Sequence, residues 1–162
     1  KLPDEVLTKP SKPVEGNQGI LIVGIDKLLT QLARCCKPAP PDPIQGFITR
    51  GKGVSVHRVD CPNFSHLAAL HPERVIETGW GGEQTGVFAT DIIVDAHDRQ
   101  GLLRDISEIF TREKLNVVGV NTQSKQGKAH MSFTVEITHL PQLQRTLTLI
   151  HEIEGVVGVR RA

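Results

Sequence analysis

A strict two-residue alternation near the C-terminal end constrains the fold of this chain most strongly. Within residues 128–137 the apolar side chains of Met131, Phe133, Val135 and Ile137 alternate with polar side chains. Successive side chains of a β-strand point to opposite faces of its sheet. The period of two therefore predicts an antiparallel strand with one buried face and one face in contact with water.

The neighbouring segments predict the rest of this domain. Apolar residues recur at helical spacing in 101–114 and 140–153, which we expect to be helices. We expect further strands over 87–95, 115–122 and 156–160. The order β-α-β-β-α-β is that of a ferredoxin-like sandwich, with two helices on one face of the sheet. The other face stays open and needs water, a ligand or another subunit.

The same element order occurs in the RNA-recognition motif, which stacks bases on aromatic side chains of its central strands. Here the third strand has a single aromatic residue, Phe133, on the side of Met131 and Val135 that we expect to face the helices. The outward set cannot stack bases, because it consists of His130, Ser132, Thr134 and Glu136. This composition argues against RNA binding of that type.

The N-terminal half divides into a predicted linker over 1–18, a small module over 19–80 and a second linker over 81–86, before the domain over 87–162. In the module we expect strands over 19–24, 44–49, 54–57 and 75–80, a helix over 62–70 and one or two helical turns over 28–35. Four prolines within 37–43 predict a rigid, extended loop.

The small module contains four side chains that can bind a metal, namely Cys35, Cys36, His57 and Cys61. Thiolates and imidazoles are preferred ligands of Zn²⁺, and four of them complete a tetrahedral structural site. Two adjacent cysteines can bind one ion only if the backbone bends there, and Pro38 favours such a bend. Asp60 is an alternative ligand or an acceptor for His57. Spacing alone also leaves buried free thiols and a redox pair open.

Basic side chains surround these candidate ligands. The net charge of +1 means that any contact with nucleic acid must come from a local patch. Arg50, Lys52 and Arg58 lie on or beside the predicted hairpin that carries His57, and Lys37 lies near Cys36. We expect them to contact phosphates, and the alternative is an ordinary solvated surface.

In the C-terminal domain, the segment from Asp98 to Gly101 joins the first strand to the first helix. We expect Asp98 to cap this helix. Gly101 and Leu102 begin it with free N–H groups that suit a small carboxylate or phosphate. Asn116 and Asn121 are candidates to add side-chain amides at the same edge, or are turned to water instead.

The sequence has no glycine-rich phosphate loop, no serine nucleophile elbow and no H-E-x-x-H motif, so we expect no catalytic activity in this chain. Its longest apolar run, Ile20 to Val23, is far shorter than the roughly 18 residues that cross a membrane. We therefore expect a cytoplasmic protein without a membrane partner. The chain begins at Lys1, not at methionine, which indicates a segment of a longer protein.

Several of these motifs resemble one protein family. The stretches CCKP at 35–38, GFITRGKGVSVH at 46–57 and RVDCPN at 58–63 resemble the conserved-cysteine (zinc-finger) region of long RelA/SpoT-type (p)ppGpp synthetases. The stretches DRQGLLRDIS at 98–107 and LNVVGVN at 115–121 resemble the ACT domain that ends the same proteins. The resemblance implies an α+β chain, with a small α/β metal-binding module followed by a ferredoxin-like βαββαβ ACT domain.

The resemblance implies regulation. The family's catalytic domains, which move pyrophosphate from ATP to GTP or GDP, precede this region. It implies structural zinc at the cysteine module, contacts with ribosomal RNA and A-site tRNA, self-association through the ACT domain and an amino-acid effector, but no DNA partner. An alternative is an amino-acid-sensing ACT module with a structural metal site and no ribosome role. A third is thiol redox chemistry at Cys35 and Cys36.

Overall fold

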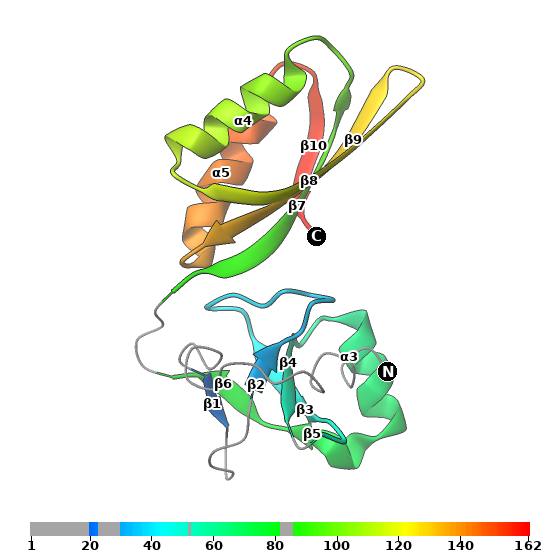
Figure 1. The fold of residues 1–162 in the computed structure, drawn as a ribbon. Helices are drawn as coiled ribbons and strands as arrows, with labels where there is room; N and C mark the ends of the chain where they lie inside the picture. Colours follow the sequence, from blue (N-terminus) through cyan, green and yellow to red (C-terminus); the bar gives the residue numbers. More distant parts are fainter. Residues whose placement is uncertain (1–19, 23–29, 52, 82–85) are drawn as a thin grey trace. The chain divides into compact units, whose positions relative to one another are not determined.

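The computed structural model describes residues 20–22, 30–51, 53–81 and 86–162. The chain divides into two compact units, Lys1–Gly86 and Val87–Ala162. Each unit combines strands with helices, which confirms the expected α+β class (Figure 1). The predicted linker over 1–18 lies outside the described residues, as does most of the linker over 81–86.

A four-stranded sheet forms the centre of the first unit. Its strand order is β2 (Thr30–Leu32), β4 (Val54–Arg58), β3 (Ile44–Ile48) and β5 (Val75–Ile76). Strand β2 is parallel to β4, whereas β3 is antiparallel to both β4 and β5. Helix α3 (Pro62–Leu70) and the short 3-10 helix η1 (Pro72–Arg74) follow β4, and β1 (Ile20–Ile22) pairs with β6 (Thr78–Trp80).

Two predictions for this unit are wrong. In the described part of 28–35, residues 30–32 form strand β2 and no helix. Their backbone pairs with the free edge of β4, and Leu32 packs against the apolar cluster of the sheet, so tertiary contacts override the helical spacing. The single strand expected over 75–80 is two short strands, because β5 pairs with β3 and β6 pairs with β1.

The strands of this sheet have a different packing partner on each face. One face is apolar and contains a buried cluster of Ile44, Val54, Val56 and Ile76. The opposite face contains Phe47, which packs with Cys61 and Phe64 at the start of α3. His57 alternates with Val56 along β4 and therefore lies on this second face, beneath α3.

The second unit is a ferredoxin-like sandwich, as expected. Its antiparallel sheet has the order β10 (Val156–Arg161), β7 (Phe88–His97), β9 (Lys128–Ile137) and β8 (Asn116–Lys125). Helices α4 (Leu102–Arg112) and α5 (Leu140–His151) both lie on one side of this sheet (Figure 1). The predicted alternation along β9 is confirmed, because Met131, Phe133, Val135 and Ile137 are all buried.

The face of this sheet away from the helices has many polar side chains. Thr134 Oγ1 donates a hydrogen bond of 2.6 Å to Asp91 across β9 and β7, and Asn116 Nδ2 donates one of 3.0 Å to Glu136. Phe133 instead packs on Phe110 of α4, with ring centroids 5.1 Å apart. The aromatic residue of the central strand is thus unavailable for base stacking. Among the described residues, no helix is long and apolar enough to cross a bilayer.

Candidate metal centre

Parallel pairing of β2 and β4 brings the candidate ligands together. The carboxyl ends of both strands lie at the same edge of the sheet, where Cys35 and Cys36 follow β2 and His57 is near the end of β4. A tight turn then returns the chain, closed by a 3.0 Å hydrogen bond from the Cys61 N–H to the Arg58 carbonyl. Cys61 is the N-cap residue of α3.

The backbone bends sharply at the two adjacent cysteines. The Lys37 N–H donates to the Ala33 carbonyl at 3.0 Å, and Lys37 has a left-handed conformation with φ of 46°. Residues other than glycine rarely adopt this conformation. The bend allows both thiols to face one point, which successive side chains of an extended strand cannot do.

The four ligand atoms form a compact group. All of them lie within 4.8 Å of one another. Cys35 Sγ is 3.5 Å from both His57 Nδ1 and Cys61 Sγ, and Cys36 Sγ is 3.9 Å from His57 Nδ1. A tetrahedron with bonds of about 2.3 Å to sulfur and about 2.0 Å to nitrogen has edges of roughly 3.5–3.8 Å. The donor set and its spacing therefore fit a tetrahedral metal ion.

The thiols do not ionise alike. The hydrogen bond from Cys36 lowers the pKa of Cys35 to about 3. The same hydrogen bond raises the pKa of Cys36, and burial raises the pKa of Cys61. These shifts favour the thiolate at Cys35 and the protonated thiol at Cys36 and Cys61. A bound metal ion needs thiolates, so its binding releases protons here.

His57 is held by a residue that the sequence reasoning did not identify. Its Nε2 lies 3.0 Å from Ser55 Oγ, and both residues are fully buried. With Nδ1 facing the thiols, the Nε2–H donates to the Ser55 hydroxyl and fixes the ring. Phe64 supports the same ring, with centroids 5.6 Å apart. Because side chains two apart on a strand share a face, the spacing of Ser55 and His57 was the available signal.

Arg58 and Asp60 support the cluster from outside. The Arg58 N–H donates to Cys36 Sγ at 3.3 Å, and its guanidinium donates to the Cys36 carbonyl at 3.2 Å. The guanidinium also makes two 3.0 Å hydrogen bonds to the Asp60 carboxylate. The expectation that Asp60 binds the metal or accepts a hydrogen bond from His57 is therefore wrong. The Asp60 carboxylate is bound to Arg58, and the partner of His57 Nε2 is Ser55.

The expected basic residues do not share one compact patch. Arg50 is exposed in the turn of the β3–β4 hairpin, whereas Arg58 lies at the opposite end, paired with Ile44. Lys37 lies in the bend beside the cluster, with Nζ 3.4 Å from the Arg34 carbonyl. Lys52 lies outside the described residues. Contact of any of these residues with nucleic acid stays a prediction.

The loop before α4 differs in part from expectation. Gly101, with φ of 83°, is the N-cap residue, and no side chain caps the helix, so the expected cap by Asp98 is wrong. Arg99 fixes the loop instead, since it donates to the Glu154 carbonyl at 2.9 Å and to Asp105 at 2.7 Å. The latter bond holds the pKa of Asp105 below its usual value. Leu102 is buried.

Within one chain, Asn116 and Asn121 do not lie together at the loop between β7 and α4. Asn116 pairs in register with Glu136, at the end of the sheet far from the β7–α4 loop. Asn121 lies mid-strand, opposite Ser132. An effector site that joins them to Gly101 therefore stays a prediction.

Comparison with known proteins agrees with both units. Residues 20–81 match the family model of the RelA/SpoT RIS domain, and residues 84–161 match that of the ACT domain. The chain joins a RelA/SpoT RIS domain to an ACT domain. Its RIS domain contains the cysteine–histidine cluster, and its ACT domain is the ferredoxin-like unit.

Among curated relatives, the GTP pyrophosphokinase of Escherichia coli is 40% identical over 154 residues, which are 94% of this chain and 21% of the relative. That of Haemophilus influenzae is 40% identical over 150 residues, 91% of this chain and 20% of the relative. The chain thus spans about a fifth of their length. A crystal structure of the ACT domain from the GTP pyrophosphokinase of Chlorobium tepidum is 17% identical, with a TM-score of 0.44, and covers 48% of this chain and 100% of that one.

Proposed function

We propose that this chain is a regulatory segment of a long, cytoplasmic GTP pyrophosphokinase of the stringent response. It senses a ribosome that has uncharged tRNA in its A site and couples this sensing to a catalytic half elsewhere in the protein. The observation that carries this proposal is the 40% identity along 94% of the chain to enzymes of which it spans 21%. The RIS and ACT domains occupy residues 20–81 and 84–161, so the transferase chemistry belongs to other parts of the parent protein.

In this proposal zinc is the structural ion of the RIS domain. Cys35, Cys36, His57 Nδ1 and Cys61 would hold it, and they come from the bend after β2, from β4 and from the start of α3. Four protein ligands leave no open position for a substrate, which favours a structural role over a catalytic one. The ion would cross-link three elements of a domain whose two apolar clusters are small.

The proposed partner surface includes the turn of the β3–β4 hairpin. Arg50 is exposed there, and Lys52 follows it in sequence. An exposed basic group such as Arg50, on a glycine-containing turn, can approach the phosphates of ribosomal RNA and tRNA. Arg58 is less suited to this role, because its guanidinium is bound to Asp60 and to the Cys36 carbonyl. Self-association and an amino-acid effector are assigned to the ACT domain.

Co-sedimentation with ribosomes that carry uncharged A-site tRNA tests the partner. We expect the variant R50E/K52E to bind these ribosomes less well than wild type. The slope of the logarithm of its binding constant against the logarithm of salt concentration should fall by about one for each phosphate contact that is lost. The matched control is R104E/R112E, which reverses two charges on α4 of the ACT domain. Equal binding by wild type and both variants would contradict the proposal. A thermal shift with amino acids, without ribosome binding, would favour the amino-acid sensor.

A further inference from the structure

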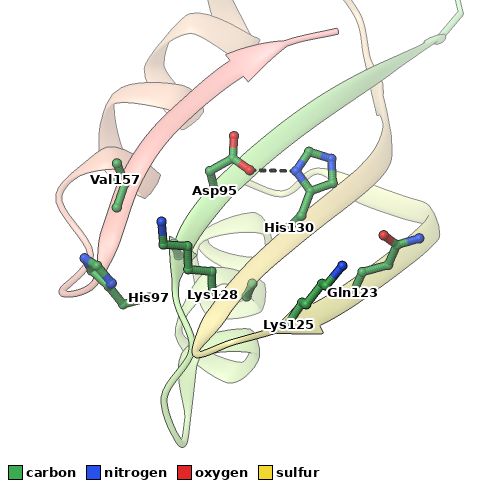
Figure 2. A pocket seen from close by; sticks show the side chains of 9 residues that line it. Asp95, His97, Gln123, Lys125, Lys128, His130 and Val157 are labelled. Carbon is green, nitrogen blue, oxygen red and sulfur yellow. Dashed lines mark hydrogen bonds and ion pairs between the residues drawn. The ribbon is translucent and has the colours of Figure 1, made fainter.

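Two rows of polar side chains cross the open face of the ACT sheet beside the β8–β9 turn (Figure 2). In the first row Lys125 of β8 pairs in register with Lys128 of β9, which pairs with His97 of β7. In the second row His130 of β9 pairs with Asp95 of β7. Because residues two apart on a strand share a face, both rows lie on the side opposite α4 and α5.

The two lysines close the hairpin as directly facing residues of like charge. The turn residues Gln126 and Gly127 have φ of 54° and 77°, the pattern of a type I′ turn, which fixes this register. Like charges that face each other across a strand pair destabilise a sheet. Asp95, Asp105 and Glu113 of the second unit form ion pairs with residues other than these lysines. These three acids therefore do not compensate the repulsion between Lys125 and Lys128.

The carboxylate next to the lysines is already engaged. Asp95 Oδ1 lies 2.6 Å from His130 Nδ1, and Figure 2 shows this contact beside Lys128. The pairing reduces the capacity of Asp95 to neutralise the lysines. It also holds the His130 imidazole above the same face of the sheet.

These rows line a cavity of about 600 Å³. Gln123 and Val157 complete its wall from β8 and from β10. Pockets for small ligands usually measure about 300–1,000 Å³ and combine apolar wall with a few polar groups. The cavity therefore has the size of a small-molecule site.

The charged side chains on the open face of the ACT sheet favour a small ligand over a nucleic-acid strand. Farther from the β8–β9 turn, the same face has the carboxylates of Asp91 and Glu136, which bond to Thr134 and Asn116. A run of phosphates along the sheet would meet these acids, so the basic groups suit one phosphate-bearing end. The central aromatic, Phe133, faces the helices and cannot stack on a base.

We propose that Lys125 and Lys128 bind the phosphate or pyrophosphate group of a small molecule in this cavity. The two side chains extend in different directions in Figure 2, and in the proposed complex both turn toward the ligand, where their ammonium groups donate charge-assisted hydrogen bonds to phosphate oxygens. The Gln123 amide is placed to bond to the rest of the ligand, and Val157 provides apolar contact. A bound phosphate removes the repulsion between the lysines, so binding and hairpin stability are coupled.

Titration of the ¹⁵N-labelled chain with inorganic pyrophosphate, and separately with GDP, tests the site by NMR. We expect saturable shifts of the amides of Lys125, Lys128 and His130. The variant K125Q/K128Q should bind at least tenfold more weakly. The control R104Q/R112Q removes two positive charges from α4 and should bind within twofold of wild type.

Thermal unfolding distinguishes a weakened site from a destabilised fold. Because K125Q/K128Q removes the like-charge pair, we expect it to melt at or above the wild-type temperature, and pyrophosphate to raise the melting temperature of wild type alone. Tighter binding of GDP would identify a nucleotide as the source of the phosphate, and tighter binding of pyrophosphate would identify the free anion. Three results would overturn the proposal: no saturable shift, equal weakening in the control, or tighter binding of a single-stranded RNA oligonucleotide.

Discussion

At the scale of single residues, His57 connects the candidate metal centre to the sheet. Its Nδ1 faces Cys35 and Cys36, while its Nε2 contacts the buried Ser55 hydroxyl. A ligand imidazole that donates its second N–H to a fixed partner keeps both its orientation and its tautomer. Ser55 is therefore a positioning residue for the candidate metal centre.

The change Ser55→Ala tests this role. It leaves the Nε2–H of a buried imidazole without an acceptor, so we expect metal affinity to fall by about 10–100-fold. Competition with a chelator of known affinity measures the change. Ser65→Ala, on the exposed side of α3, is the matched control and should keep wild-type affinity. Equal affinities of the two variants would show that the Ser55 hydroxyl does not hold the ligand.

Sequence reasoning identified the cluster but not its supports. Thiol and imidazole chemistry was sufficient to select all four candidate ligands, Cys35, Cys36, His57 and Cys61, which the structure brings within 4.8 Å. The role of Asp60 was missed because it depends on Arg58, whose guanidinium reaches both that carboxylate and the Cys36 carbonyl. Long side chains have many possible partners, and only the folded backbone selects among them.

At the scale of elements, the sequence pattern predicted strand β9 but not strand β2. Strand β9 has ten residues, enough to show a clear period of two. Strand β2 has three, and its conformation depends on hydrogen bonds to β4 more than twenty residues away. A short edge strand is defined by its partner, so its own pattern could not reveal it.

Gly46 shows how closely the strands of the RIS domain are packed. A Cβ atom at this position would lie 2.7 Å from Val54, 2.8 Å from Thr78 and 2.9 Å from Ile76. All three neighbours are β-branched, and such side chains have little freedom at χ1. The strands themselves would have to move apart to admit a methyl group.

We therefore expect Gly46→Ala to destabilise the RIS domain by about 1–3 kcal/mol, the usual cost of overpacking a core. The midpoint of urea unfolding measures this. Gly79→Ala in β6 is the matched control, because its Cβ would meet nothing within 4 Å. If both variants unfold at the same midpoint, steric exclusion at Gly46 does not limit the packing of these strands.

At the scale of the whole molecule, the chain has two separate cores. Within its described residues the RIS domain has two small apolar clusters, one of which contains the candidate ligand Cys61 together with Phe47 and Phe64. The ACT domain has a larger core that includes Phe110, Phe133 and the buried residues of both helices. The candidate metal ligands thus belong to the first domain, and the second contains no residue of the cluster.

Removal of the metal should therefore destabilise one domain only. A ligand that binds the folded state alone stabilises it by about 4 kcal/mol at a concentration 1,000 times its dissociation constant. We expect calorimetry of the zinc-loaded chain to show two transitions, and EDTA to lower the temperature of the RIS transition without moving the ACT transition. The variant Cys61→Ser should melt at the lower temperature and not respond to EDTA. A chelator that shifts both transitions, or neither, would contradict a structural metal confined to the RIS domain.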